Sequence, residues 1–181
     1  ASKNNNQLNL IDFGGSLGST YFQNKDFFNH LMVFRWNIVE QDNFVAEGKE
    51  TFEDDVLKLY YKIEDTLNLN NRVLLVSNTL QYLKNPDGFI EKITDMDFDY
   101  IIFEFTAFIE SKHDLLTVQN VPEKIYKASY PAWFFNEEKF LVKFYNKYTV
   151  KSSFDSQHTN PFILNDEKVY WKGFILEKTY E

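Results

Sequence analysis

Short apolar stretches alternate with amphipathic stretches along most of this chain. Five of them have the length and residue types of strands, at 8–12, 36–39, 56–63, 72–76 and 99–105. Between them, the spacing of apolar residues predicts helices over 19–31, 44–52 and 86–94, and a turn or short helix at 79–83. Strands that alternate with helices indicate βαβ units and a mainly parallel sheet.

The pattern changes after the fifth strand. Residues 111–131 are less regular, and Asn136 then predicts a capped helix over 137–145 with two glutamates in its first turn. Two late strands, 148–154 and 168–177, flank a polar loop and predict an antiparallel pair at the sheet edge. The fold class that follows is α/β, with a Rossmann-like, doubly wound, mainly parallel sheet of seven strands that ends in an antiparallel pair.

Composition narrows the kinds of protein that the chain can be. Its 181 residues predict a single domain over 1–181, with 1–6 as a flexible polar lead. There is no cysteine, which excludes disulfides and thiolate metal sites. No stretch reaches the roughly 20 apolar residues of a membrane span, and the start is not a signal peptide, so we expect a cytoplasmic protein. The net charge of −8 argues against a nucleic-acid partner.

The most informative motif joins the first strand to the first helix. The run LNLIDFGGSLGS at 8–19 places Asp12 at the end of an apolar strand, directly before Gly14, Gly15 and Gly18. Glycines at such a turn allow tight backbone angles and the close approach of a ligand. Ligands of doubly wound sheets bind at the carboxyl ends of the strands. Those ends carry polar residues at 12–14, 40–41, 61–62, 77–78 and 104.

The details of this corner favour S-adenosyl-L-methionine as the cofactor. The glycine spacing departs from the G-x-G-x-x-G fingerprint of dinucleotide sites, which disfavours a nicotinamide-dependent oxidoreductase. Asp12 suits a ligand that carries an ammonium and a sulfonium, and Glu40 lies where a carboxylate can accept hydrogen bonds from both ribose hydroxyls. The alternatives are a loop-stabilising carboxylate at Asp12 and a solvated strand end at Glu40.

At these residues the sequence resembles a family of bacterial methyltransferases that use S-adenosylmethionine and are often encoded among polysaccharide biosynthesis genes. The resemblance covers nearly the whole chain and rests on LIDFGGSLGSTYFQN at 10–24, WNIVEQ at 36–41, FVAEGKE at 44–50, SNTLQYLKNP at 77–86, TVQNVP at 117–122, IYKASYPAW at 125–133 and KGF at 172–174. It implies the class I methyltransferase fold. Two features differ: the family's acidic-arginine-threonine run is Glu104-Phe105-Thr106 here, and the family has residues before the first strand that would cover the cofactor.

The resemblance implies roles for particular residues. The cofactor would be bound by Asp12, Gly14, Gly15, Gly18, Glu40, Ser77 and Asn78. An aromatic face at Tyr21 or Tyr82 would suit the sulfonium, and the acceptor would meet Tyr82, Tyr130 and Trp133, for which core packing is the alternative. The general base is not identified; Glu104 and His113 are weak candidates, against a structural carboxylate and an exposed loop histidine. His30 and His158 have no companions that indicate a metal site.

Two functions from different classes follow. The first is an S-adenosylmethionine-dependent methyltransferase that acts on a small molecule, such as a sugar or a polysaccharide precursor. The second is a non-catalytic binding or assembly protein that keeps the methyltransferase fold, with which the missing base and the missing arginine are compatible.

Overall fold

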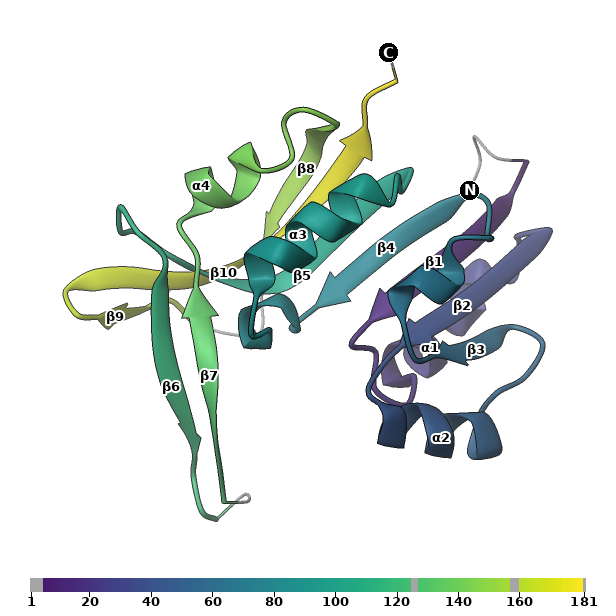
Figure 1. The fold of residues 1–181 in the computed structure, drawn as a ribbon, viewed down its shortest axis with the longest axis horizontal. Helices are drawn as coiled ribbons and strands as arrows, with labels where there is room; N and C mark the ends of the chain where they lie inside the picture. Colours follow the sequence, from purple (N-terminus) through teal and green to yellow (C-terminus); the bar gives the residue numbers. More distant parts are fainter. Residues whose placement is uncertain (1–4, 125–126, 157–159, 181) are drawn as a thin grey trace. The chain divides into compact units, whose positions relative to one another are not determined.

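The computed structural model describes residues 5–124, 127–156 and 160–180 (Figure 1). Residues 1–4 of the predicted lead, 125–126 of the family motif and His158 therefore lie outside the described residues. Backbone contacts divide the chain into two compact units, Ala1–Ser77 with Met96–Ile102 and Asn78–Asp95 with Phe103–Glu181.

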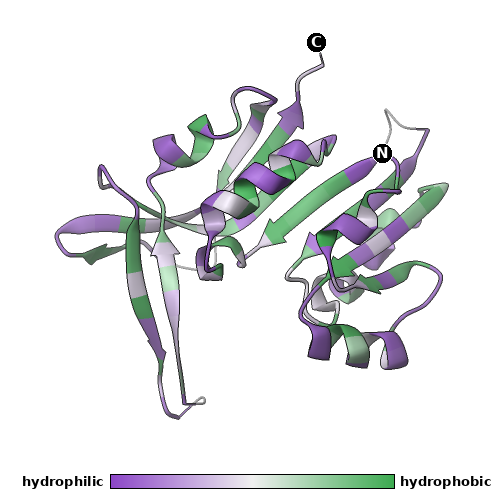
Figure 2. Ribbon diagram, viewed as in Figure 1, coloured by the Kyte–Doolittle hydropathy of each residue, from purple (hydrophilic) through white to green (hydrophobic). Residues whose placement is uncertain are grey.

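The first unit is built on parallel strands in the order β3-β2-β1-β4, with the first residues of β5 next to β4. Their bounds are Leu57–Tyr60 for β3, Val33–Val39 for β2, Gln7–Phe13 for β1, Arg72–Ser77 for β4 and Tyr100–Ile109 for β5. β1 pairs in parallel with both β2 and β4. β4 is hydrophobic along almost its whole length, and Leu74, Leu75 and Val76 are buried (Figure 2). The predicted strands are therefore present, and β1, β2, β3 and β4 pair in parallel as expected.

The helices of the first unit are shorter than predicted. The pattern over 19–31 gives α1 (Ser19–Asn24) and then the 3₁₀ helix η2 (Lys25–Phe28). The Asn24 side chain donates a hydrogen bond to the carbonyl of Thr20, the kind of local bond that competes with a continuing helix. α2 (Asp42–Thr51) follows β2 as expected, whereas the predicted strand over 56–63 is divided between β3 and η3 (Ile63–Thr66), because the exposed pair Tyr61 and Lys62 interrupts the alternation.

The second unit contains the antiparallel strands at the end of the chain. β5 is followed by β10 (Glu167–Lys178) and β8 (Tyr148–Asp155), and the short β9 (Phe162–Leu164) pairs with β10. β10 is antiparallel to both β8 and β9, so the predicted antiparallel pair is confirmed. The predicted class is confirmed with it: a mixed α/β fold, with mostly parallel strands and antiparallel strands near the end of the chain.

Phenylalanine side chains fill the core of the second unit. Phe103 contacts Phe140 and Phe144 with ring centroids 5.0 and 5.5 Å apart, and Phe108 contacts Phe174 at 5.7 Å. The helices are η4 (Leu80–Tyr82), α3 (Pro86–Asp95) and α4 (Glu137–Val142). The Asn136 side chain accepts a hydrogen bond from the Lys139 amide at 2.8 Å, which confirms the predicted cap, although α4 ends before residue 145.

A hairpin occupies the region that the sequence left without regular structure, so that prediction was wrong. β6 (Leu115–Val121) pairs with β7 (Ala128–Phe134) as a separate antiparallel sheet. Most positions of both strands are exposed or half-buried, and Pro131 lies within β7. The alternation of apolar and polar residues that marks a strand was therefore weak. Within the described part of the chain, no helix is long and apolar enough to span a membrane.

Candidate functional site

The loop after β1 is held in an uncommon backbone conformation. Gly14, Ser16 and Gly18 all have positive φ, at 79°, 53° and 89°. The Gly14 amide donates to the carbonyl of Val39 at 2.9 Å, which ties the loop to the end of β2. A Cβ at Gly18 would lie 3.2 Å from Ile38 Cδ1, so both space and φ favour glycine there. The loop therefore approaches β2 closely, with the tight backbone angles that the glycines predicted.

Four strand ends of the first unit bring predicted cofactor residues to one edge. Phe13 is paired with Val39, so Gly14 and Glu40 follow side by side. Val39 is paired with Tyr60, which places Tyr61 next to Glu40 on the outer side. Asp12 is paired with Leu75, which places the end of β4 at Ser77 beside the start of the glycine loop. The edge therefore carries, in order, Tyr61, Glu40, Gly14 and Ser77.

Asp12 lies beneath this edge. Its side chain is 2% exposed, and Oδ2 accepts a hydrogen bond from the indole Nε1–H of Trp36 at 2.9 Å. A Cβ at Gly15 would lie 2.5 Å from the same oxygen, so Gly15 rests directly on the carboxylate. This geometry favours the loop-stabilising role for Asp12, and a direct contact with a cofactor stays a prediction.

Sequence reasoning missed Trp36 as the partner of Asp12. A buried indole usually needs an acceptor for its N–H. Trp36 is 2% exposed within an apolar strand, and Asp12 is the buried carboxylate at the end of the neighbouring strand. These two features could have predicted the hydrogen bond between Trp36 and Asp12.

Glu40 is half-buried at the end of β2, in front of α2. Its Oε2 accepts a hydrogen bond from the Gln41 amide at 2.5 Å, and its own amide donates to the carbonyl of Tyr60 at 3.2 Å. Among the described residues, Oε1 has no hydrogen-bond partner. The carboxylate is thus fixed through one oxygen and has the other available for a ligand.

The predicted residues after β4 belong to a hydrogen-bonded group in the second unit. The Asn78 amide donates to the carbonyl of Glu104 at 3.0 Å, and Asn78 Oδ1 accepts from Gln81 Nε2 at 2.7 Å. Gln81 Nε2 also donates to the carbonyl of Phe105 at 3.2 Å. Asn78 is exposed, whereas Gln81 is 2% exposed. Gln81 therefore connects Asn78 to β5 through its side-chain amide.

The three aromatic residues predicted for the acceptor come together beside η4. The rings of Tyr82 and Tyr130 meet edge to face at 5.3 Å, and Tyr82 Oη donates to Gln119 Oε1 at 3.3 Å. Trp133 Nε1 donates to the carbonyl of Leu83 at 3.2 Å. All three side chains are half-buried. The hairpin therefore presents aromatic surface next to the segment that follows β4.

The two weak candidates for a base have different surroundings. Glu104 does not end the fifth strand as predicted, because β5 continues to Ile109. It is half-buried, and its carbonyl accepts from the Asn78 amide. His113 is exposed in the loop before β6, where its Nδ1 lies 3.1 Å from Lys139 Nζ.

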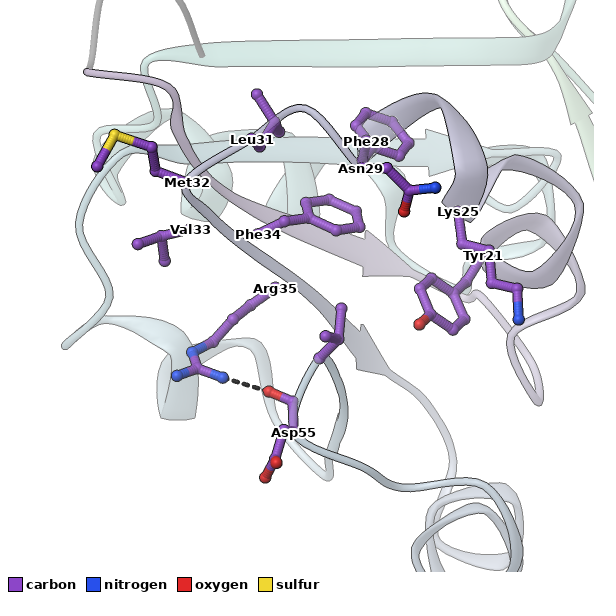
Figure 3. Close-up of a pocket in the computed structure, with 11 residues that line it drawn as sticks. Tyr21, Lys25, Phe28, Asn29, Leu31, Met32, Val33, Phe34, Arg35 and Asp55 are labelled. Atoms are coloured by element: carbon purple, nitrogen blue, oxygen red, sulfur yellow. Dashed lines mark hydrogen bonds between the residues drawn. The ribbon is translucent and has the colours of Figure 1, made fainter.

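A cavity of about 450 Å³ in the first unit is lined by none of the residues of this edge (Figure 3). Tyr21, predicted as an aromatic face for the sulfonium, is buried and lines this cavity instead. The cavity is also lined by the first half of β2, including Phe34 and Arg35, and by Phe28. The rings of Phe28 and Phe34 stack at 4.4 Å, and the Arg35 guanidinium donates to the Asp55 carbonyl. Glu40 lies at the opposite end of β2, so this cavity is not the predicted cofactor site. Across residues 5–124, 127–156 and 160–180, no group of three or more His, Asp or Glu side chains could hold a metal ion.

Several solved structures have a similar fold, and methyltransferases are among them. An S-adenosylmethionine-dependent methyltransferase from Clostridium acetobutylicum superposes with a TM-score of 0.58 and 10% identity, over 97% of this chain and 86% of that one. N-methyltransferase NodS from Bradyrhizobium japonicum, solved with S-adenosyl-L-homocysteine, gives 0.54 and 11%, over 95% and 78%. LepI, solved with S-adenosylmethionine, gives 0.63 and 6%, over 96% of this chain but 43% of LepI. No family model and no curated protein matches the sequence.

Proposed function

We propose that this protein binds S-adenosyl-L-methionine and transfers its methyl group to a small-molecule acceptor. The observation that carries the proposal is the edge formed by Tyr61, Glu40, Gly14 and Ser77, where a pinned glycine loop lies beside a carboxylate with one available oxygen. The similarity of the fold to methyltransferases supports it.

Each residue of this edge has a role in the proposal. Glu40 accepts hydrogen bonds from the ribose hydroxyls, and the glycine loop lets the cofactor approach the backbone. Asp12 acts beneath the loop, since it supports Gly15 and binds Trp36. Ser77 and Asn78 take the amino-acid end of the cofactor. When bound, S-adenosylmethionine supplies an electrophilic methyl group.

For the acceptor we propose a saccharide or polysaccharide precursor. The rings of Tyr82 and Tyr130, with Trp133 nearby on β7, offer the aromatic surface on which sugar rings pack. Glu104 and His113 stay the candidate bases for a hydroxyl or amine acceptor. Incubation with radiolabelled S-adenosylmethionine and a panel of nucleotide sugars tests this part, and label in a sugar product supports it.

Titration calorimetry tests the cofactor. We expect S-adenosylmethionine and S-adenosylhomocysteine to bind and NADH not to bind. Glu40→Ala should weaken S-adenosylmethionine by about 1–3 kcal/mol, or roughly 5- to 150-fold, because hydroxyl groups lose their acceptor. Glu40→Gln, which keeps one acceptor oxygen, should lose less. Glu50→Ala is the matched control, since it removes an exposed carboxylate from α2.

The other outcomes are equally informative. If NADH binds and S-adenosylmethionine does not, the protein is a nucleotide-dependent oxidoreductase instead. If neither binds, the proposed function is wrong and the non-catalytic alternative is favoured. An affinity unchanged by Glu40→Ala would remove Glu40 from the site.

A further inference from the structure

The hairpin of β6 and β7 presents a free strand edge in the second unit. Among the described strands, β6 pairs only with β7, and no backbone hydrogen bond from elsewhere in the described part of the chain reaches it. Figure 1 shows both strands extending away from β10 and α4. A two-stranded hairpin is marginally stable in water, and an exposed strand edge is a template for pairing. The outer edge of β6 can therefore accept a further strand.

Pro131 determines which backbone groups of β6 point to this edge. It is paired with Val118 and has no N–H, so these two residues cannot exchange the two hydrogen bonds of a bonded pair. Bonded and non-bonded pairs alternate along an antiparallel ladder, and the backbone groups of a non-bonded pair point away from the partner strand. The N–H and C=O groups of Leu116, Val118 and Asn120 therefore point to the free edge of β6.

β6 lacks the features that usually protect a strand edge. Charged side chains and proline on an edge strand hinder pairing with another strand. β8, the outer strand of the second unit, carries Lys151 and Asp155, and β7 carries Pro131. The sequence of β6, LLTVQNV, contains neither a charge nor a proline, and its Leu116 and Val118 are 51% and 66% exposed. The edge of β6 is therefore open to pairing, whereas the edge of β7 is blocked at its proline.

We propose that β6 pairs in antiparallel fashion with β6 of a second copy of this chain, so that two hairpins form one four-stranded sheet. A two-fold axis at Val118 places it opposite its own copy, and places Leu116 opposite Asn120 of the partner subunit. The three outward-facing residues then all form bonded pairs, which gives about six backbone hydrogen bonds. Because Pro131 blocks the outer edge of β7, the assembly ends at the dimer.

The side chains of the hairpin favour a second copy as the occupant. An interface with two-fold symmetry uses the same surface on both subunits, so a strand without charge meets no like charge there. Leu116 and Val118 share one face of the hairpin with their paired residues Trp133 and Pro131. Pairing at the axis would join two such apolar faces into one. The chain has a net charge of −8, but β6 offers a basic partner no carboxylate.

Analytical ultracentrifugation at increasing protein concentration tests the dimer. We expect the molecular mass to rise towards twice that of one chain. Val118→Lys and Val118→Glu each place like charges opposite each other at the axis, so each should weaken the dimer at least about tenfold. An equimolar mixture of the two variants should restore association, because the facing charges are then opposite. Val150→Lys, at an exposed valine of β8, is the matched control and should associate like the wild type.

Amide hydrogen exchange tests where the two copies meet. The amides of Leu116, Val118 and Asn120 should become protected as the protein concentration rises. Those of Thr117 and Gln119 already pair with β7 and should change little.

The inference is overturned if the wild type stays monomeric at every concentration, or if it dimerises while the exchange of the three outward-facing amides is unchanged. A dimer that neither Val118 variant weakens would also overturn it, since the interface would then lie elsewhere. None of these measurements requires a cofactor, so their outcome is independent of the proposed function.

Discussion

Gly15→Ala is the substitution for which the structure makes the sharpest claim. A Cβ at this position would lie 2.5 Å from Asp12 Oδ2, 2.6 Å from Cγ and 3.0 Å from Oδ1. The carboxylate has little freedom to move, because Asp12 is 2% exposed and Oδ2 is bound by Trp36 Nε1 at 2.9 Å. We therefore expect the added methyl group to destabilise the glycine loop and the strands beneath it.

The size of the effect follows from these distances. The Cβ would be about 0.9 Å inside the 3.4 Å lower limit of an ordinary contact. Overpacking of this kind costs about 1–3 kcal/mol when the surroundings absorb it. If Asp12 moves away instead, the loss of a hydrogen bond to a charged group costs about 1.5–3 kcal/mol. Either route lowers the free energy of unfolding by about 1–3 kcal/mol. The melting temperature should therefore fall by roughly 2–12 °C.

Urea denaturation followed by tryptophan fluorescence measures this change. Gly88→Ala is the matched control: its Cβ would also lie 2.5 Å from a polar atom, Asn85 Nδ2, but Asn85 is exposed. If Asn85 rotates away, it loses only the hydrogen bond that its Oδ1 accepts from the Gly88 amide at 3.0 Å, which costs about 1 kcal/mol. Alanine is also favoured over glycine in α3 by about 1 kcal/mol, so this variant should change stability little. The reasoning is refuted if Gly15→Ala costs no more than Gly88→Ala. Asp12→Ala removes the carboxylate that an alanine at position 15 would clash with. The reasoning is therefore also refuted if Gly15→Ala lowers the free energy of unfolding as much in an Asp12→Ala background as in the wild type.

Two further predictions concern hydrogen bonds of buried side chains. Trp36→Phe removes the indole donor to Asp12 and should lower the free energy of unfolding by about 1.5–3 kcal/mol in the same urea assay, and a loss below about 0.5 kcal/mol would contradict the role of this bond. Burial, and next the hydrogen bond to Glu137, raise the pKa of Tyr170 above its usual 10.0. The resulting stabilisation is complete below pH 10.0 and decreases as pH rises above it, so Tyr170→Phe should lose less stability than the wild type between about pH 9 and about pH 11. Parallel losses in the two proteins would show that the Tyr170 hydroxyl does not contribute.

The sequence predicted most of the fold because its signals were local. The apolar run of β4, the spacing of apolar residues in α3 and the Asn136 cap each act within a few residues. The hairpin β6–β7 escaped notice because its strands are paired with each other and mostly exposed, so burial imposed no clear alternation on them. The hairpin is held in place by the pairing of its two strands and by their contact with η4. The pattern of apolar and polar residues along the sequence shows neither of these contacts.

The candidate site was predictable in its positions and less so in its interactions. Gly14 and Glu40 both follow the predicted ends of strands, and the parallel pairing of β1 with β2 places them side by side. The role of Asp12 depends on Trp36, a residue 24 positions away. Sequence reasoning assigned the carboxylate to a ligand because charge was visible and the indole partner was not. A pair that forms only through tertiary structure cannot be read from either residue alone.

Backbone strain, seen as a positive φ at residues other than glycine, also occurs at the candidate site. Among the described residues other than glycine, positive φ occurs at Asn or Asp in every case except Ser16 and Phe105. Asn and Asp tolerate this conformation and mark ordinary turns, which makes those positions recognisable in a sequence. Serine and phenylalanine do not signal it. Ser16 lies in the glycine loop, and the Phe105 carbonyl accepts a hydrogen bond from Gln81 Nε2. Ser16 is therefore part of the loop to which we assign cofactor binding, as expected if the strain is retained for the geometry that it enforces.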